Sequence, residues 1–211
     1  LYWSARAKQR LGDTAGASAR FVLTATDYLN SYYGRLAVAQ LGAGASVPSS
    51  LVAQPGLRPP PPPNERQIAL LMALGLHDLV LAEVQFARRV HGDSPVLQAT
   101  AAFAQYRAGR LRPGINAMKR AYPQYLASGG ESLPQDVLRV IFPIDYWQQL
   151  EGSAKRRGLD PYLVVALAAQ ESPFDAGISS SAGAIGLRQI MPATGRSVAS
   201  QLGIKPFSSR R

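Results

Sequence analysis

The chain has 211 residues, 46% of them hydrophobic, which is enough to bury a sizeable core in one or two domains. Its net charge of +10 and pI of about 10.3 predict an anionic partner such as nucleic acid, a membrane surface or an acidic polymer. The absence of cysteine excludes a disulfide framework and a cysteine-based metal site, and no apolar run is long enough to span a membrane. No signal peptide is visible, and because the chain begins at Leu1 we expect a mature form or an excised fragment.

The first 41 residues predict short amphipathic helices joined by tight turns. Apolar residues keep helical spacing up to Gly12, a second helix begins at Thr14 or Ser18, and a third follows a cap at Asn30 or Ser31. Such a succession is typical of stacked α-hairpins. No clean repeat of about 34 residues establishes a true tandem array.

Residues 42–63 form the clearest irregular segment, and they end in five consecutive prolines. Proline runs favour the polyproline II conformation. The segment is either a ligand for a proline-binding domain or a stiff connector between two helical layers. The sequence favours the connector, because Pro-rich segments commonly act as semi-rigid spacers.

Four further helices are predicted after the connector, with start signals at Asn64 and at Ser94. They span residues 65–74, 78–90, 95–106 and 114–122. His77 and His91 lie in or beside these helices without a carboxylate or a second histidine at ligand spacing. We therefore interpret both histidines as structural or surface residues and expect no metal site.

Residues 128–136 mark a change of composition and a candidate domain boundary. Beyond it, 137–143 is apolar and 144–157 is an amphipathic helix that ends in Lys155-Arg156-Arg157. This basic cluster either contacts an anionic polymer or is a solvated last turn that complements the helix dipole, and the second interpretation is favoured. No basic stripe alternates with aromatic residues, so nucleic acid is not the favoured partner.

The next helix carries the main candidate for chemistry. Asp160 is a predicted N-cap with proline at the first helical position, and 162–169 has no polar face, which predicts a helix buried on all sides. Glu171 stands at its C-terminal end. Burial and the negative end of the helix dipole both raise the pKa of a carboxyl group, as a general acid near neutral pH requires. The alternative is a glutamate that faces solvent or pairs with an arginine.

A run of small residues follows at 179–186, and 187–192 then supplies an amide and a methionine. Small side chains allow backbone and ligand to approach closely and leave N–H and hydroxyl groups available. Alone, such a loop is a turn between helices. With a buried acid about ten residues earlier, it predicts the wall of a cleft.

The run QESPFDAGISSSAGAIGLRQIMPATG resembles the catalytic signature of soluble lytic transglycosylases, the lysozyme-like enzymes that cleave peptidoglycan. The family pattern is Glu-Ser, an aromatic residue two positions on, a Ser/Ala/Gly run, Gly-Leu-Met-Gln and Met-Pro-x-Thr. The matching positions are 171–172, 174, 180–184, 186–189 and 191–194. IFPIDYWQQL resembles the family's entry segment, and WSARA and SYYGRLA resemble its superhelical domain.

This resemblance implies an all-α fold: a TPR-like α-hairpin superhelix over 1–135, followed by the first part of a lysozyme-like, mainly helical domain over 136–211. The family's catalytic domain continues with an Asn-Ile segment, an Ala-Tyr-Asn motif and an active-site tyrosine, and none of these follows Gly203. We therefore expect a C-terminally truncated or degenerate copy of that domain.

The resemblance also implies the site residues. Glu171 matches the family's single catalytic acid, and Ser180, Gln189 and Met191 match positions that line the sugar subsites. Arg188 stands where the family usually has methionine. Asp175 stands where asparagine is common, so no second catalytic carboxylate is assigned to it.

The implied activity is non-hydrolytic cleavage of the β-1,4 bond between N-acetylmuramic acid and N-acetylglucosamine, which leaves 1,6-anhydromuramoyl ends. No metal or cofactor is implied. The expected partners are peptidoglycan glycan strands and, secondarily, cell-wall proteins, and the expected location is the periplasm or the cell envelope. The alternatives are an inert peptidoglycan-binding or scaffold fragment and a muramidase-type hydrolase.

Overall fold

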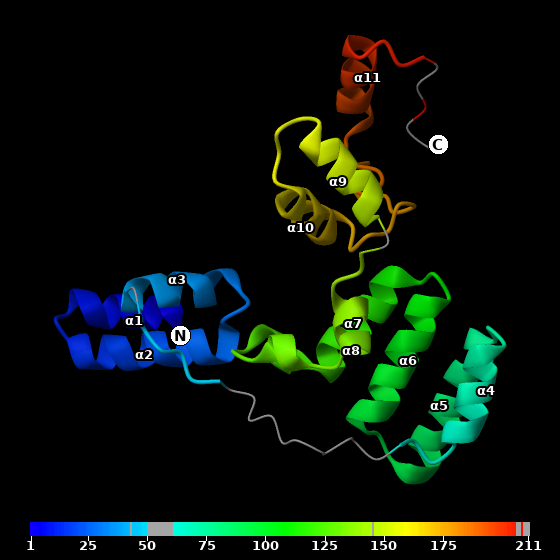
Figure 1. The fold of residues 1–211 in the computed structure, drawn as a ribbon, viewed down its shortest axis with the longest axis horizontal. Helices are drawn as coiled ribbons and strands as arrows, with labels where there is room; N and C mark the ends of the chain where they lie inside the picture. The colour runs from blue at the N-terminus through cyan, green and yellow to red at the C-terminus, as the bar shows by residue number, and fades with distance from the viewer. Residues whose placement is uncertain (43, 50–60, 145, 206–207, 209–211) are drawn as a thin grey trace.

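The computed structural model describes residues 1–42, 44–49, 61–144, 146–205 and 208. These residues form eleven α-helices and two short 3₁₀-helices, and extended pairing among them is limited to isolated bridges at Ser179, Ile185 and Ile190. The all-α fold predicted from the sequence is therefore confirmed (Figure 1).

The first helical layer contains the three helices expected in the first 41 residues. They are α1 (Tyr2–Arg10), α2 (Thr14–Tyr28) and α3 (Tyr32–Leu41). Asp13 caps α2 by accepting a hydrogen bond from the Gly16 amide at 2.8 Å, and Ser31 caps α3 through the Gly34 amide at 3.1 Å. Between these helices lies a small buried core that includes Phe21.

Gly34 allows α3 to approach the end of α2. A Cβ atom at this position would overlap the backbone carbonyl of Tyr28 and lie 2.8 Å from the Cα atom of Leu29. The first turn of α3 therefore packs directly on backbone, and no side chain larger than hydrogen fits there.

The second layer contains four helices, which follow one another in green and cyan in Figure 1. They are α4 (Glu65–Ala73), α5 (His77–His91), α6 (Pro95–Arg107) and α7 (Leu111–Ala121). Ser94 caps α6 as predicted, by accepting from the Leu97 amide at 3.2 Å. Asn64 makes no capping bond: its side-chain nitrogen donates to the carboxylate of Glu83 at 2.8 Å, and its Oδ1 atom, which would accept the capping bond, has no hydrogen-bond partner among the described residues.

A glycine also brings α7 close to α6. A Cβ atom on Gly114 would lie 2.8 Å from the backbone nitrogen of Tyr106 and 2.9 Å from the carbonyl oxygen of Ala102. This close approach fixes α7 on α6, next to the buried Ile115.

The two layers meet through a junction of short elements: η1 (Pro123–Leu126), η2 (Gly130–Ser132) and α8 (Gln135–Ile141). The amide of Asn30 donates to the carbonyl oxygens of Tyr125 at 3.1 Å and Ala127 at 3.2 Å. The backbone of Ser128 donates to Thr26 at 2.8 Å. These bonds attach the α2–α3 turn directly to the junction.

The C-terminal unit contains α9 (Trp147–Lys155), α10 (Pro161–Glu171) and α11 (Pro192–Gln201), which stand beyond the end of α6–α8 in Figure 1. The predicted start of α10 is confirmed, because Asp160 accepts a hydrogen bond from the Tyr162 amide at 2.9 Å. α9 begins three residues later than predicted.

The prediction that α10 is buried on all sides is wrong for the described residues. Val164 and Ala168 are buried, whereas Tyr162, Leu163 and Leu167 are 72%, 64% and 41% exposed. The difference arises because only one side of α10 is packed, where it meets α9 and the cluster around Ala168. An all-round apolar composition therefore does not report which side of this helix is covered.

Two predictions about organisation remain untested. Most of the predicted connector, residues 43 and 50–60, lies outside the described residues. Two of the five prolines of the polyproline II prediction lie outside them as well, so this prediction is not tested. The division into domains at 1–135 and 136–211 stays a prediction. Within the described residues, no helix combines the length and hydropathy needed to cross a membrane.

Candidate active site

The C-terminal end of α10 is fixed by Ser172, which is fully buried. Both its backbone amide and its hydroxyl donate to the carbonyl oxygen of Ala168 at 3.1 Å. These two bonds satisfy an otherwise free carbonyl at the helix end. They also fix the backbone directly after Glu171, the last residue of α10.

Glu171 itself is exposed, which corrects the expectation that this carboxyl group is buried. No hydrogen bond or ion pair joins its side chain to any residue that the structure describes. Glu171 lies one turn after Leu167, on the side of α10 that the described chain leaves exposed. Glu171 is thus a free carboxyl group, held at a defined backbone position.

The turn after Glu171 carries strained backbone and a buried aromatic ring. Phe174 is 3% exposed although its φ of 62° lies in the left-handed region that glycine favours. Asp175 accepts a hydrogen bond from the Gly177 amide at 2.9 Å. One carboxylate oxygen of Asp175 is therefore engaged in shaping the turn.

The small-residue loop is a compact double turn. The backbones of Ile185 and Ile190 exchange two hydrogen bonds of 3.1 Å, and the Ser180 hydroxyl accepts from the Ala184 amide at 3.0 Å. Gln189 donates its side-chain amide to the carbonyl oxygens of Gly186 at 2.9 Å and Ile178 at 3.4 Å. Ser180 and Gln189 therefore belong to one folded loop, and each uses part of its hydrogen-bonding capacity to stabilise that loop.

Met191, the last of the predicted site residues, lies at the same turn as Arg188, which stands where the family usually has methionine. Met191 is 44% exposed and precedes α11, so its side chain is available to a ligand. Arg188 is half-buried, and its Nε atom is buried without a hydrogen-bond partner among the described residues.

This loop and the end of α10 share one apolar cluster. Its buried members are Ala168, Phe174 and Ile115, and Leu187 packs against them from the loop. The cluster thus places the loop of Ser180 and Gln189 beside the helix end that carries Glu171. Sequence reasoning did not find Ile115, because it lies 56 positions before Glu171 and outside every motif.

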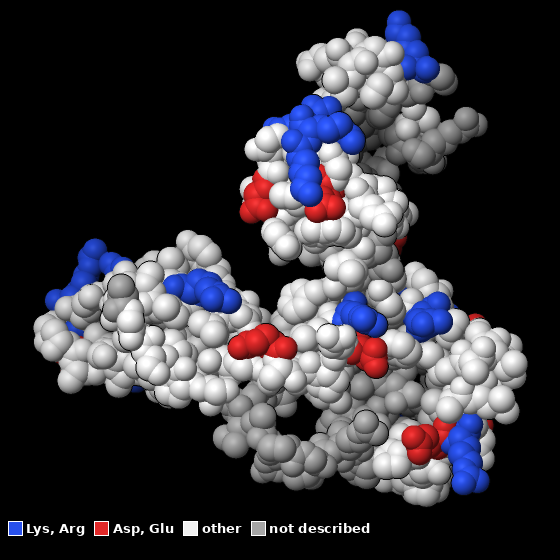
Figure 2. Space-filling view, viewed as in Figure 1, with Lys and Arg blue, Asp and Glu red and all other residues white. Residues whose placement is uncertain are grey.

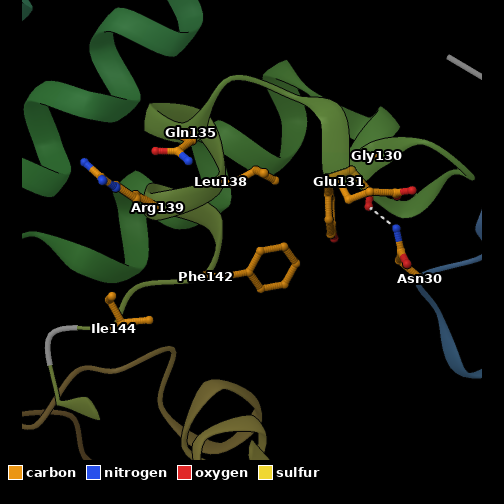
Figure 3. A pocket seen from close by; sticks show the side chains of 9 residues that line it. Asn30, Gly130, Glu131, Gln135, Leu138, Arg139, Phe142 and Ile144 are labelled. Carbon is orange, nitrogen blue, oxygen red and sulfur yellow. Dashed lines mark hydrogen bonds between the residues drawn. The ribbon is translucent and has the colours of Figure 1, made fainter. Parts of the chain in front are cut away.

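A second candidate site is a pocket of about 540 Å³ at the junction (Figure 3). Its nine lining residues are Asn30, Tyr125, Gly130, Glu131, Gln135, Leu138, Arg139, Phe142 and Ile144. Figure 3 shows Arg139 and Glu131 on opposite sides of Leu138 and Phe142. Neither charged side chain makes an ion pair or hydrogen bond with another described residue. The pocket therefore has an apolar floor with one free cation and one free anion.

The basic cluster predicted at the end of α9 is visible as blue side chains over that helix in Figure 2. Lys155 pairs with Glu151 at 2.9 Å, and Arg156 donates to the Ser153 hydroxyl at 3.2 Å. These local contacts favour the interpretation as a solvated last turn. Among the residues with described positions, no group of three His, Asp or Glu side chains could hold a metal ion.

The helical layers and the α9–α11 unit together define a helical, lysozyme-like fold class. Residues 148–210 match the family model of the transglycosylase SLT domain. An inactive mutant of lytic transglycosylase Slt from Pseudomonas aeruginosa, in which a glutamate is replaced by glutamine, shares 25% identity and a TM-score of 0.61 with this chain. The matched segment and this structural neighbour support a relationship between the chain and the soluble lytic transglycosylases.

Two further solved structures share the fold at 20% identity. One is the 70-kDa soluble lytic transglycosylase in complex with bulgecin A, with a TM-score of 0.60. The other is the 70-kDa enzyme from Escherichia coli, with a TM-score of 0.57. Each comparison covers 99% of this chain but only 31–32% of the matched protein, so the chain spans about a third of their length.

Proposed function

We propose that this chain is part of a peptidoglycan lytic transglycosylase in which Glu171 acts first as general acid and then as general base. The observation that supports this best is the free carboxyl group of Glu171 at a fixed helix end, beside the loop of Ser180 and Gln189 and inside the matched SLT region. The Slt mutant of P. aeruginosa, inactive with a glutamate replaced by glutamine, is in keeping with such a role.

In the first step, protonated Glu171 donates its proton to the glycosidic oxygen between N-acetylmuramic acid and N-acetylglucosamine. The bond from this oxygen to the muramoyl C1 breaks, and the N-acetyl group of the same sugar stabilises the positive charge that develops at C1. One acid suffices for such a substrate-assisted reaction, whereas enzymes that use two carboxylates need both beside the scissile bond.

In the second step, the Glu171 carboxylate accepts the proton of the sugar's own C6 hydroxyl group. The O6 atom then bonds to C1 and closes the 1,6-anhydro ring. Glu171 ends protonated, ready for another cycle, and no water is consumed. The exposed position of Glu171 leaves room for a sugar on the open side of α10.

The loop supplies the proposed sugar contacts. The Ser180 hydroxyl accepts one local bond and still has its proton to donate, and the Gln189 carbonyl oxygen is free because only the amide nitrogen is engaged. Met191 offers an adaptable apolar surface. Arg188 adds a cation where the family usually has methionine, which suits a substrate that carries carboxylates.

The proposal is tested by incubating the full-length protein with purified sacculi and analysing the released fragments by mass spectrometry. We expect products with 1,6-anhydromuramoyl ends. Products with reducing ends would instead identify a muramidase-type hydrolase. Binding to sacculi without any product would favour the inert, peptidoglycan-binding alternative.

The junction pocket supports peptidoglycan as the substrate class, because stem peptides carry carboxylates that Arg139 is free to bind. We expect Arg139→Ala to weaken binding of peptide-bearing glycan strands about tenfold, since one exposed charge-assisted contact is lost. Binding of N-acetylglucosamine oligosaccharides, which carry no carboxylate, should not change. Both quantities are measurable by isothermal titration calorimetry.

The matched control is Arg157→Ala, which removes another exposed arginine outside the pocket. An equal loss of affinity in both variants would indicate nonspecific attraction by the net charge of +10 and would remove the pocket from the proposal. A peptidoglycan substrate also implies that the protein works in the periplasm or at the cell envelope, which we include in the proposed function.

A further inference from the structure

The apolar cluster behind Glu171 draws on two parts of the chain. Ala168 lies on α10 and Phe174 in the turn after it, whereas Ile115 belongs to α7 of the second helical layer. All three are buried, with exposures of 0%, 3% and 1%. A helix outside the matched SLT region, which begins at residue 148, therefore completes the core next to the candidate catalytic residue.

The backbone between Glu171 and this cluster has little freedom. Ser172 is bound twice to the Ala168 carbonyl oxygen, and the Asp175 amide donates to the Ser172 carbonyl oxygen at 3.0 Å. Phe174 lies between these bonds and is held in the left-handed region. Because strained backbone persists only when its surroundings fix it, the packing around the Phe174 ring must maintain this conformation.

Ile115 is itself held in place. The adjacent Gly114 lets α7 lie against the backbone of α6, at the distances given above. Leu111, on the same helix, also packs against the cluster. α7 therefore presents a fixed apolar surface on which the turn after Glu171 rests.

We propose that Ile115 is a positioning residue for Glu171, so that the second helical layer is part of the catalytic unit and not only a scaffold beside it. This inference rests on the proposed function of Glu171. Truncating Ile115 leaves a cavity under the turn, Phe174 relaxes into it, and the carboxyl group moves from its working position. A small displacement of a catalytic group lowers kcat more than it weakens substrate binding, because it acts mainly on the transition state.

The test compares Ile115→Ala with Ile68→Ala in the full-length protein. Ile68 is 6% exposed and lies in the separate core of α4–α6, so the same atoms are removed from another buried site. For Ile115→Ala we expect kcat to fall about 30-fold with KM within about twofold, and Ile115→Val to restore most of the rate. Ile68→Ala should leave kcat within about twofold while lowering stability comparably.

Hydrogen exchange gives a readout that does not depend on activity. We expect faster amide exchange across 172–178 in Ile115→Ala but not in Ile68→Ala. Equal losses of kcat in the two alanine variants, or unchanged exchange at 172–178, would overturn the inference. If the wild-type protein makes no 1,6-anhydro product, the proposed function fails, and the exchange data still decide whether Ile115 holds the turn. If Ile115→Ala does not fold, the comparison is made between Ile115→Val and Ile68→Val, and we expect a smaller but measurable rise in exchange across 172–178 in Ile115→Val alone.

Discussion

Replacing Glu171 by glutamine is expected to reduce peptidoglycan lysis by at least about 10³-fold, toward the upper range for loss of a general acid–base group. Glutamine keeps the size and polarity of the side chain, but it cannot supply the proton that the leaving oxygen needs. Since the Glu171 side chain makes no hydrogen bond or ion pair with any described residue, the substitution breaks no such bond. Release of soluble fragments from sacculi measures the rate, and a pull-down with sacculi shows that binding is kept.

Asp175→Asn is the matched control for this substitution. It makes the same acid-to-amide exchange four positions along, and asparagine can still accept the hydrogen bond from the Gly177 amide. We expect its activity to stay within about threefold of the wild type. Substantial residual lysis by Glu171→Gln would remove Glu171 from the acid role, and an equal loss in Asp175→Asn would indicate a two-carboxylate mechanism.

Gly34→Ala is expected to have the largest effect on stability. The added methyl group would overlap the Tyr28 carbonyl, so α3 must move away from the end of α2. Overpacking of this kind costs about 3 kcal/mol, and backbone atoms yield less than side chains. The loss of stability should be confined to α1–α3. Hydrogen exchange resolved by segment measures it better than one melting temperature, because a chain of several units need not unfold in one step.

Gly152→Ala in α9 provides the control for the glycine substitution. There a Cβ atom would meet only the end of the Arg156 side chain, at 3.5 Å, which is ordinary contact distance. Alanine is a better helix former than glycine, so we expect this variant to be stabilised by about 0.5–1 kcal/mol. Equal destabilisation of both variants would contradict the close packing of α3 on α2.

The helices were largely predictable because their start signals act locally. Ser31, Ser94 and Asp160 each accept a bond from an amide two or three residues on, and that geometry is inherent in the local sequence. Asn64 does not cap α4, because its side-chain nitrogen is held by Glu83, 19 positions away, and its oxygen is left without a hydrogen-bond partner among the described residues. The burial of α10 was misjudged because the composition of a helix does not reveal which of its sides other elements cover.

The candidate site was predictable to the extent that it lies in one continuous motif. Glu171, Ser180 and Gln189 fall within 19 positions of one another, and local turns bring the last two together. Ile115 and Arg139 come from distant segments whose relevance depends on tertiary packing alone. No periodicity or spacing in their own helices distinguishes them from other apolar or basic helix residues.

The bonds from the Asn30 amide to the carbonyl oxygens of Tyr125 and Ala127 join residues 95 and 97 positions apart. They fasten the first layer to the junction independently of the segment between α3 and α4. These two hydrogen bonds therefore resist relative motion of the first layer and the junction without help from the backbone that connects them in sequence.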